Sequence, residues 1–498
     1  MLLCGFRCIP SIKMGYIPKR CIFTALSFFG IFIIYATRVN MSVAIVAMVN
    51  STIESPLNGS EAVAGCPSLW HNETQDNDKD FKGAKYNWNS EIQGIVLSSF
   101  YYGYIMTQLP GGVLCDKVGA KWLFGGGVLI TTALYLLVPL AASWGVIAVV
   151  VIRILEGIGE GLTFPALIHA ISNWSPKFER SRISSIIALG IPIGNIIGSP
   201  ISGYLSSSDL FGGWPSTFYL FGTIGCVWFL LWCILAFETP ECHPRISKTE
   251  LLYIQQNKSE KSKKDVPIPW KDIFLSFPMW AVIISHFGHN YAFLMFLTMM
   301  PTYFKTILHF DIKTNGLLSA LPYVVQGIST FLASYCADKL RESKKLSITA
   351  IRKICNTIGL FGPALCCLGI IAAGCHAQLI IVLLCLTMCL NDFVYSGFNV
   401  THIDMSPDYA GVLFAITNTI SNTAGILSPT IVGLLTANGE TVENWNKIFF
   451  ITSAVYVSCG LFYAIFASAE VQPWGLANRD TQKVDEKKMK IFFIEPTS

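Results

Sequence analysis

The chain has 498 residues, of which 52% are hydrophobic and only 13% are charged, and its mean hydropathy is +0.52. A water-soluble protein carries about 25% charged residues, so the composition excludes an ordinary soluble domain. The net charge of +4 is small. We expect a lipid bilayer as the surroundings of the chain and no nucleic-acid partner.

Apolar runs of about 20 residues, each long enough to cross a bilayer, recur along the whole chain. The runs are continuous rather than alternating, so they predict helices and not the strands of a barrel. The sequence therefore predicts an all-α polytopic membrane protein with twelve transmembrane helices. We expect the spans near residues 22–47, 92–114, 122–142, 145–171, 183–206, 216–237, 276–299, 313–336, 351–374, 378–401, 410–436 and 447–468.

The loops between these spans predict the orientation of the chain. The first apolar run is too long for the core of a signal peptide, so it is read as the first span. Basic residues gather in alternate loops and near both ends of the chain. The positive-inside rule makes that side cytoplasmic. The predicted parts are a cytoplasmic N-terminus, a six-helix half, a cytoplasmic central loop, a second six-helix half and a cytoplasmic tail: 1–21, 22–237, 238–275, 276–468 and 469–498.

The longest loop on the opposite side, 48–91, is polar and mostly acidic. It contains the sequons of Asn58 and Asn72, which predict glycosylation in a lumenal or extracellular space. Cys66 in this loop and Cys375 between two later spans both fall on the predicted outer side. They could form a disulfide in an oxidising space or remain two free thiols.

The two halves of the chain contain a weak internal repeat. GGVLCDKVGAK follows the second span and SYCADKLRESKK follows the eighth. Two six-helix halves around a central site are a known plan for transporters. In the first copy we expect Asp116, Lys117, Gly119 and Lys121 to form a gating motif.

Ionisable residues inside the spans give the sharpest functional signal, because each costs about 2.5–3.5 kcal/mol at the bilayer centre and usually has a function. Arg38 lies in the first span, and Arg153, Glu156 and Glu160 lie in the fourth. On a helix the last three fall on one stripe. Their positions predict an anion as cargo and a cation that couples its transport.

Two interpretations of these charges stay open. Arg153 and Glu156 could form an internal salt bridge, or one of Glu156 and Glu160 could bind and release a cation, since burial and a nearby arginine oppose each other in setting a carboxylate's proton affinity. The planar fork of Arg38 suits a carboxylate or phosphate ligand. Its alternative role is a static pair with one of the glutamates.

Further candidates for substrate binding lie in the first, second and seventh spans. His286 and His289 could donate to substrate or carry protons, or could be satisfied packing residues. Tyr35 and Tyr101 could line the cavity. In the fifth span a ridge repeats every four residues, and we expect it to pack against another helix; it consists of Gly190, Gly194 and Gly198.

Several longer stretches carry a family resemblance. They are YATRVNMSVAIVAMV, SSFYYGYIMTQLPGG, RILEGIGEGLTFPA, FLTMMPTYFKTIL and GFNVTHIDMSPDYAGVLFAITNT, together with GGVLCDKVGAKW. Over about residues 22–475 the chain resembles the anion–cation symporter branch of the major facilitator superfamily. That branch contains sialin, to which the likeness is greatest, the type I sodium–phosphate cotransporters and the vesicular glutamate transporters.

The resemblance implies roles for particular residues. It associates Arg38 with anion recognition and Glu156 and Glu160 with proton coupling, and it matches His286 to a histidine of sialin. His289 and Leu97 stand where the vesicular glutamate transporters hold an arginine and a histidine, which argues against glutamate packaging as the main activity. Counterparts of Cys66 and Cys375 in sialin favour the disulfide.

The leading hypothesis is proton-coupled symport of an acidic sugar or similar organic anion by alternating access. The alternative is sodium-dependent phosphate entry at the plasma membrane. We expect no cofactor beyond the coupling ion, H⁺ or Na⁺, no metal site, no enzymatic activity and a monomer. His402 with Asp404 is the nearest approach to a catalytic pair. Residues 1–21 lack an acidic dileucine signal, so both a lysosomal or vesicular membrane and the plasma membrane stay open.

Overall fold

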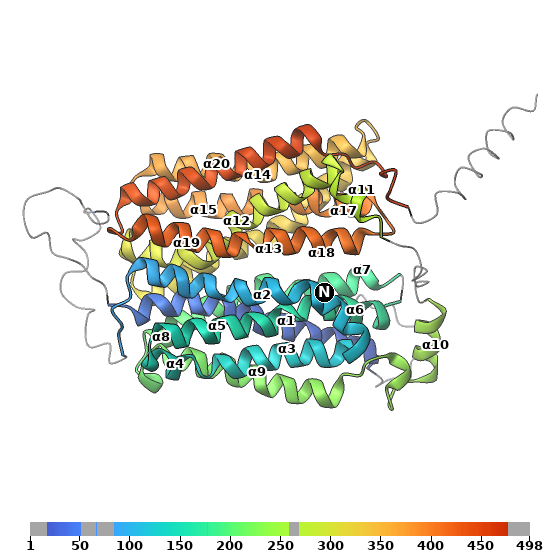
Figure 1. Cartoon of the computed structure of the whole chain (residues 1–498), viewed down its shortest axis with the longest axis horizontal. Helices are drawn as coiled ribbons and strands as arrows, with labels where there is room; N and C mark the ends of the chain where they lie inside the picture. Colours follow the sequence, from blue (N-terminus) through green and yellow to red (C-terminus); the bar gives the residue numbers. More distant parts are fainter. Residues whose placement is uncertain (1–16, 51–65, 67–83, 177, 258–267, 477–498) are drawn as a thin grey trace, which may run out of the picture.

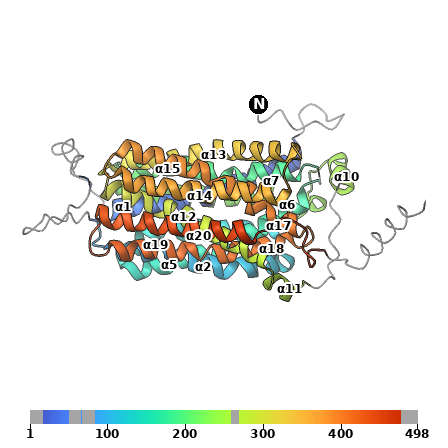
Figure 2. The same cartoon turned by 90° about the horizontal axis from the view of Figure 1, so that it is seen from above.

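The structure is a computed structural model, and it describes residues 17–50, 66, 84–176, 178–257 and 268–476. Helices dominate this part of the chain, and its only β pairing is an isolated bridge between Val49 and Tyr86. Long helices lie side by side in both views (Figures 1 and 2). The predicted all-α architecture is therefore confirmed.

The first half of the bundle is drawn in blue to green in Figure 1. Its helices are α1 (Lys19–Met48), α2 (Ser90–Val118), α3 (Ala120–Tyr135), α4 (Val138–Trp144), α5 (Val146–Gly161), α6 (Thr163–Trp174), α7 (Arg180–Ala188), α8 (Gly190–Ser206) and α9 (Pro215–Leu235). The pairs α3–α4, α5–α6 and α7–α8 each continue one another across a short break.

The second half is drawn in yellow to red (Figure 1). Its helices are α12 (Phe277–Thr306), α13 (Ile312–Glu342), α14 (Ile348–Ala373), α15 (Ala377–Asn391), α16 (Phe393–Ser396), α17 (Phe398–Met405), α18 (Ala410–Ser421), α19 (Ala424–Thr436) and α20 (Val442–Phe466). The connection between the halves, which the sequence analysis treated as a loop, also contains α10 (Lys248–Gln256) and α11 (Trp270–Phe274).

Nine of the described helices are long and apolar enough to cross a membrane, and the bent pair α3–α4 makes a tenth candidate. Helix α2 and the pair α5–α6 run alongside them (Figure 1). We call the end of the bundle where α1 ends and α2 begins the loop end. The opposite end, where α1 begins and α20 ends, is the terminal end. The sequence predicts that the loop end is lumenal or extracellular.

Glycines allow helices of the first half to pack with their backbones in contact. A Cβ added to Gly103 on α2 would lie 2.0 Å from the carbonyl oxygen of Ile154 on α5, and one on Gly157 would lie 2.0 Å from that of Phe100. The ridge of α8 packs on α1 in the same way, since a Cβ on Gly194 would lie 2.6 Å from the carbonyl oxygen of Phe32. The predicted packing role of this ridge is confirmed.

The two halves meet most closely toward the loop end. A Cβ on Gly203 of α8 would lie 2.9 Å from the Cα of Gly316 on α13, and one on Gly94 of α2 would lie 2.6 Å from the carbonyl oxygen of Pro429 on α19. Nearer the terminal end, a Cβ on Gly112 of α2 would meet nothing within 4 Å. The bundle is therefore closed at its loop end.

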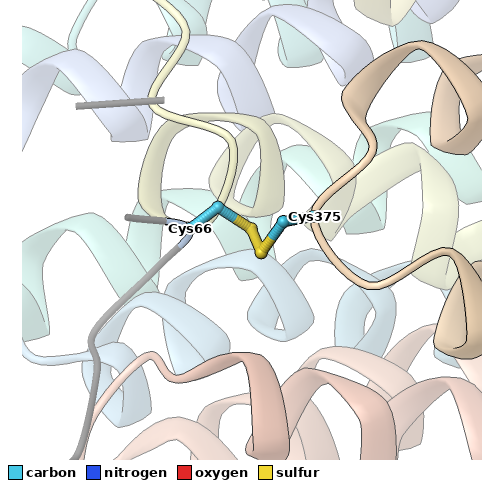
Figure 3. Close-up of a disulfide and its surroundings, with 2 residues drawn as sticks. All are labelled: Cys66 and Cys375. Atoms are coloured by element: carbon cyan, nitrogen blue, oxygen red, sulfur yellow. A yellow bond between two sulfur atoms is a disulfide. The ribbon is translucent and has the colours of Figure 1, made fainter. Parts of the chain in front are cut away.

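A disulfide also joins the halves at the loop end. Cys66, from the connection between α1 and α2, bonds Cys375, from the connection between α14 and α15, with 5.5 Å between their Cα atoms (Figure 3). The backbone N–H of Cys66 also donates to the carbonyl of Ile307 at the end of α12. The first half thus has a covalent tie to the second.

Candidate functional site

The centre of the candidate site is a buried ion pair between two helices. Nη2 of Arg38 on α1 donates to Oε1 of Glu160 near the end of α5. Their side chains are 5% and 1% exposed. The sequence analysis left open whether Arg38 binds an anion or pairs with a glutamate, and in this structure the glutamate is its partner.

Aromatic rings surround the guanidinium of Arg38. Its Cζ lies 4.8 Å from the ring centre of Tyr35, 5.0 Å from that of Phe100 and 5.1 Å from that of Tyr104. Tyr101 is a little farther, at 5.9 Å. Such rings attract a cation through their negative faces. They also exclude water, so the site stabilises a positive charge that only an anionic group can neutralise fully.

A second ion pair lies one turn earlier on α5. Nη1 of Arg153 donates to Oε2 of Glu156 at 2.7 Å, as three-residue spacing on a helix allows. Both side chains are buried. The Cζ of Arg153 also lies 5.0 Å from the ring centre of Phe100, so this ring contacts both arginines.

The position of Glu160 depends on a break between α5 and α6. Pro165 lies early in α6, and a proline ring clashes with the carbonyl four residues before it. That carbonyl belongs to Gly161, where α5 ends. The hydroxyl of Thr163 donates to the backbone oxygen of Glu160 at 2.6 Å. This hydrogen bond satisfies a carbonyl group at the break between the two helices. Irregular backbone beside a buried charge is typical of transporter sites.

Four buried polar atoms at these pairs have no hydrogen-bond partner among the residues that the structure describes. They are Nε of Arg38, Oη of Tyr101, Nε of Arg153 and Oε1 of Glu156. Buried polar groups in native proteins are nearly always satisfied. Nε of Arg38 and Oη of Tyr101 can both donate, so a small anion with several oxygens would suit them.

Tyr101 connects the site to the other half. A Cβ on Gly425 of α19 would lie 2.4 Å from the ring of Tyr101, so the ring rests directly on this glycine. Leu294 and Leu297 of α12 belong to the same apolar cluster as Tyr101 and Phe100. Movement of the halves would therefore change the surroundings of Arg38.

The two candidate histidines form hydrogen bonds within the second half. Nδ1 of His286 lies 3.1 Å from Oγ1 of Thr417, and Nε2 of His402 lies 2.9 Å from the same hydroxyl. Nδ1 of His289 lies 3.1 Å from Oδ1 of Asn391. The grouping of these histidines with Arg38 as substrate ligands stays a prediction.

His402 and Asp404 do not form a catalytic pair. Asp404 accepts from Nε of Arg352 at 2.7 Å, whereas His402 contacts Thr417 and the backbone oxygen of Asn399. The described residues also contain no cluster of three metal-ligating side chains.

The predicted gating motif closes the turn between α2 and α3. Gly119 has a φ of +93°, which favours glycine, and the backbone N–H groups of Ala120 and Lys121 donate to the carboxylate of Glu238 after α9. Nζ of Lys121 donates to the backbone oxygen of Cys233. Lys117 is exposed. The side chain of Asp116 lies outside the described part, as do Asn58 and Asn72.

Sequence reasoning missed several residues of these sites. Phe100 and Tyr104 touch Arg38, but aromatic residues are too common in spans to stand out. Glu238, which accepts the backbone hydrogen bonds of the gating motif, lies just beyond the predicted span 216–237. Asp392 lies inside the tenth predicted span and met the criterion that identified Arg38, yet it was not singled out.

Comparison with known proteins decides the family. The family model for the Major Facilitator Superfamily matches residues 27–429. The chain belongs to this superfamily. Its predicted fold, with transmembrane helices in two six-helix halves, is the fold of that family.

Individual relatives cover almost the whole chain. Human sialin is 41% identical over 457 residues, which is 91% of this chain and 90% of sialin. A Drosophila ananassae protein described as an inorganic phosphate cotransporter is 40% identical, covering 92% of this chain and 94% of the relative. Vesicular glutamate transporter 2.1 of Danio rerio is 36% identical over 92% of this chain and 75% of that protein. The resemblance to this group of transporters is thereby confirmed.

Solved structures agree on the fold. An inward-facing bacterial homolog of the human lysosomal transporter Spinster matches 92% of this chain and 100% of its own with a TM-score of 0.68, at 12% identity. A D-xylose–proton symporter matches 90% of this chain and 99% of its own with a TM-score of 0.64, at 16% identity. The fold and the relatives are those of membrane transporters.

Proposed function

We propose that the protein is a proton-coupled symporter of an acidic sugar or a similar small organic anion. The observation that carries this proposal is the pair of Arg38 and Glu160 inside an aromatic enclosure. Nε of the guanidinium and the hydroxyl of Tyr101, whose ring centre lies 5.9 Å from Cζ of Arg38, both lack a hydrogen-bond partner among the described residues. An anionic group can approach the guanidinium at Nε and compete with Glu160.

Competition for Arg38 explains how anion and proton are coupled. A buried arginine needs one negative partner, and Glu160 is that partner in this structure. When a substrate carboxylate takes this place, Glu160 would be a buried carboxylate without a cation, which is costly. Protonation removes that cost. Anion binding and proton binding therefore favour each other, and the two ligands cross the membrane together.

The second ion pair has a different task in this proposal. Arg153 and Glu156 lie on one helix and move together, so they remain paired when the halves move. The guanidinium of Arg153 contacts the ring of Phe100, and this contact keeps the ring beside Arg38. We assign the proton to Glu160 and a positioning role to the other pair.

Alternating access follows from the arrangement of the halves. The loop end is closed by α8 against α13 and by α2 against α19. In the transport cycle these contacts open while the terminal end closes. The ring of Tyr101 lies between Arg38 and Gly425 of the second half. An anion bound at Arg38 would therefore change the contact between the two halves.

An acidic compartment provides enough energy for such a cycle. A tenfold proton gradient supplies about 1.4 kcal/mol per proton, and 100 mV adds about 2.3 kcal/mol for each net charge moved. One proton per monovalent anion would therefore export the anion from an acidic lumen. We place the protein in a lysosomal or vesicular membrane with both termini in the cytoplasm.

Sodium-dependent entry of inorganic phosphate is the second candidate. The relative described as an inorganic phosphate cotransporter, at 40% identity and 94% coverage, favours it. Phosphate can also bind an arginine fork. In that case the protein would act at the plasma membrane and sodium, not a proton, would accompany the anion.

Uptake into proteoliposomes separates the two candidates. The purified protein is given radiolabelled sialic acid, glutamate or inorganic phosphate under a proton gradient alone or a sodium gradient alone. We expect acid-driven uptake of sialic acid that does not need sodium. Phosphate uptake that requires sodium and ignores the proton gradient would overturn the proposal in favour of the second candidate.

A matched pair of variants tests the assignment of the proton. Glu160→Gln removes the buried carboxylate, and Glu443→Gln makes the same change at a side chain that is 81% exposed on α20. We expect the first variant to lose acceleration by the proton gradient and the second to behave as the wild type. Equal acceleration in all three proteins would contradict the role of Glu160.

A further inference from the structure

The second half of the bundle also contains a carboxylate deep among its helices. Asp392 lies at the break between α15 and α16, and it is 0% exposed. The break places it opposite α13, near the middle of the predicted tenth span. A carboxylate at such a depth is expensive unless it has a function.

Three neutral side chains of α13 hold this carboxyl group. Nε2 of Gln326 lies 3.0 Å from Oδ1 of Asp392. The hydroxyls of Ser329 and Thr330 lie 2.9 Å and 2.6 Å from Oδ2. All three come from one turn of α13, so a single helix face forms the whole hydrogen-bonding shell.

The hydrogen-bond partners of the Asp392 side chain in the described part of the chain are all neutral. Among the described residues, no Lys, Arg or His forms an ion pair with it. Arg352 on the neighbouring α14 donates instead to Asp404 and to the backbone oxygen of Ser396. In this respect Asp392 differs from Glu156 and Glu160, each of which has an arginine partner.

The same shell can satisfy both protonation states of Asp392. If the group is ionised, Gln326, Ser329 and Thr330 all donate to it. If Oδ2 carries a proton, it donates to Oγ1 of Thr330. The hydroxyls of Ser329 and Thr330 then turn to the backbone oxygen of Gln326, which lies 2.9 Å and 3.0 Å away. A hydroxyl that can donate or accept makes this exchange possible without moving any heavy atom.

The other ionisable side chains near Asp392 are neutral or form hydrogen bonds elsewhere, so Asp392 is the side chain that would change its charge. Tyr395 on α16 and Tyr323 on α13 are neutral phenols at physiological pH. His289 on α12 and Tyr456 on α20 interact with the neighbouring Asn391. Other phenol and thiol side chains on α13, α14 and α15 are Tyr335, Cys336, Cys355, Cys366, Cys367, Cys385 and Cys389.

We propose that Asp392, held by Gln326, Ser329 and Thr330, is a second proton-binding site in the second half of the transporter. In the structure described here it carries a proton, because its burial is not balanced by any cation. It releases this proton when α13 and α15 separate and water reaches it. Its part in coupling rests on the proposed proton-driven function, but its protonation does not.

Infrared difference spectroscopy tests protonation without reference to transport. The purified protein in lipid is titrated, and the carbonyl-stretch band of protonated carboxylic acids is compared between wild type and Asp392→Asn. We expect the variant to lack one such band at neutral pH. Asp404→Asn is the control, because Asp404 pairs with Arg352 and should contribute no band. A spectrum unchanged by Asp392→Asn would overturn the proposal.

A second variant keeps the test informative if Asp392→Asn fails to fold. Thr330→Val removes the hydroxyl closest to Oδ2 and leaves the carboxyl group in place. We expect the band to persist and to shift in frequency, since its strongest hydrogen bond is lost. A band at the wild-type frequency, or one that disappears when sodium is added at constant pH, would contradict a proton site of this geometry.

Measurement of the proton-to-anion ratio tests the part in coupling. Reversal potentials are measured in proteoliposomes with a proton gradient and labelled sialic acid. We expect the ratio to fall by one proton in Asp392→Asn while uptake persists. An unchanged ratio would overturn the coupling role of Asp392. A wild type that shows no proton-driven uptake would instead reject the proposed function, and the infrared result would still decide whether Asp392 binds a proton.

Discussion

The two halves of the bundle handle buried charge in different ways. The first half contains two arginine–glutamate pairs within a few turns of each other. The centre of the second half contains histidines, hydroxyls and amides that hydrogen-bond one another, together with Asp392 and its neutral partners, and its ion pair of Arg352 and Asp404 joins α14 to α17. The two halves share a fold, so the difference reflects their tasks.

The comparison shows where exchange of partners can occur. An ion pair between two helices can open and accept a new anion, as Arg38 and Glu160 can. A pair within one helix, such as Arg153 and Glu156, cannot separate by helix movement. A neutral network can change its hydrogen bonds without any change in charge. We therefore place anion recognition in the first half, and we place shaping of the substrate pocket and the proposed second proton site at Asp392 in the second half.

The largest effect is expected from removal of the arginine in the first half. Arg38→Ala should abolish uptake, because the cation that pairs with Glu160 is lost and Arg153 is already paired with Glu156. It should also destabilise the protein by about 3–5 kcal/mol, since Glu160 would remain buried without a partner. Uptake in proteoliposomes and thermal unfolding in detergent measure the two effects.

The double variant Arg38→Met with Glu160→Gln sharpens this prediction. It removes both charges, so most of the stability should return, whereas uptake should not. If the double variant transports anions as well as the wild type, the ion pair is only structural and the contrast between the halves fails.

Removal of the disulfide between the halves is expected to have a smaller effect, and an effect on stability alone. Cys66→Ser should lower the midpoint of thermal unfolding, because the disulfide closes a loop across a sequence separation of 309 residues. Chain entropy sets an upper limit of about 5 kcal/mol for such a loop. Cys375→Ser should match it, and Cys242→Ser, at an exposed free thiol, should have no effect. Loss of uptake with unchanged stability would show that the tie takes part in transport.

The neutral network of the second half should affect selectivity more than coupling. Thr417→Val removes the hydroxyl that joins His286 and His402. We expect KM for the transported anion to rise by up to about tenfold, which corresponds to about 1.4 kcal/mol and the loss of one hydrogen-bonded contact. The proton-to-anion ratio should stay the same. A changed ratio would place part of the coupling in this network.

The smallest effect concerns pH at the loop end. Burial raises the pKa of Glu440, although the hydroxyl of Ser90, 2.6 Å away across the halves, opposes the rise. A carboxyl group with a raised pKa in the closed state binds a proton more tightly there than after opening exposes it. Acid should therefore stabilise the closed loop end, and this effect should fade as the pH rises through the raised pKa.

Accessibility of cysteines introduced at the loop end measures this closure as a function of pH. We expect labelling to decrease on acidification, by at most about tenfold per pH unit for one proton. Glu440→Gln should flatten the dependence, and Glu443→Gln, at an exposed neighbour, should not. An identical pH dependence in all variants would exclude Glu440 as the sensor.

The sequence was sufficient for the fold and for most of the charged residues. Apolar runs predict the helices, and charges within them single out Arg38 and the three charged residues of α5. The partner of Arg153 could be foreseen because Glu156 lies on the same helix face. For Arg38 the sequence offered a pair with one of the glutamates as an alternative to an anion, but it could not select Glu160, which lies 122 residues away on another helix. Only tertiary packing brings the two together.

Other parts of the sites needed the structure for similar reasons. The breaks in the helices near Glu160 and Asp392 interrupt runs that look continuous in the sequence. His286 and His289 are neighbours along α12, yet they contact different helices of the second half. Asp392 could have been found from its type and position. That its partners are neutral could not be predicted, because this depends on which side chains of α13 and α14 lie next to it in the fold.

The most direct test of the central claim is the uptake of protons when an anion binds. Sialic acid is added to the purified protein in weakly buffered solution with a pH indicator. If the anion displaces Glu160 from Arg38, about one proton should be taken up for each anion bound by the wild type, and one fewer by Glu160→Gln. Equal proton uptake by the two proteins at equal anion binding would contradict the exchange of partners at Arg38.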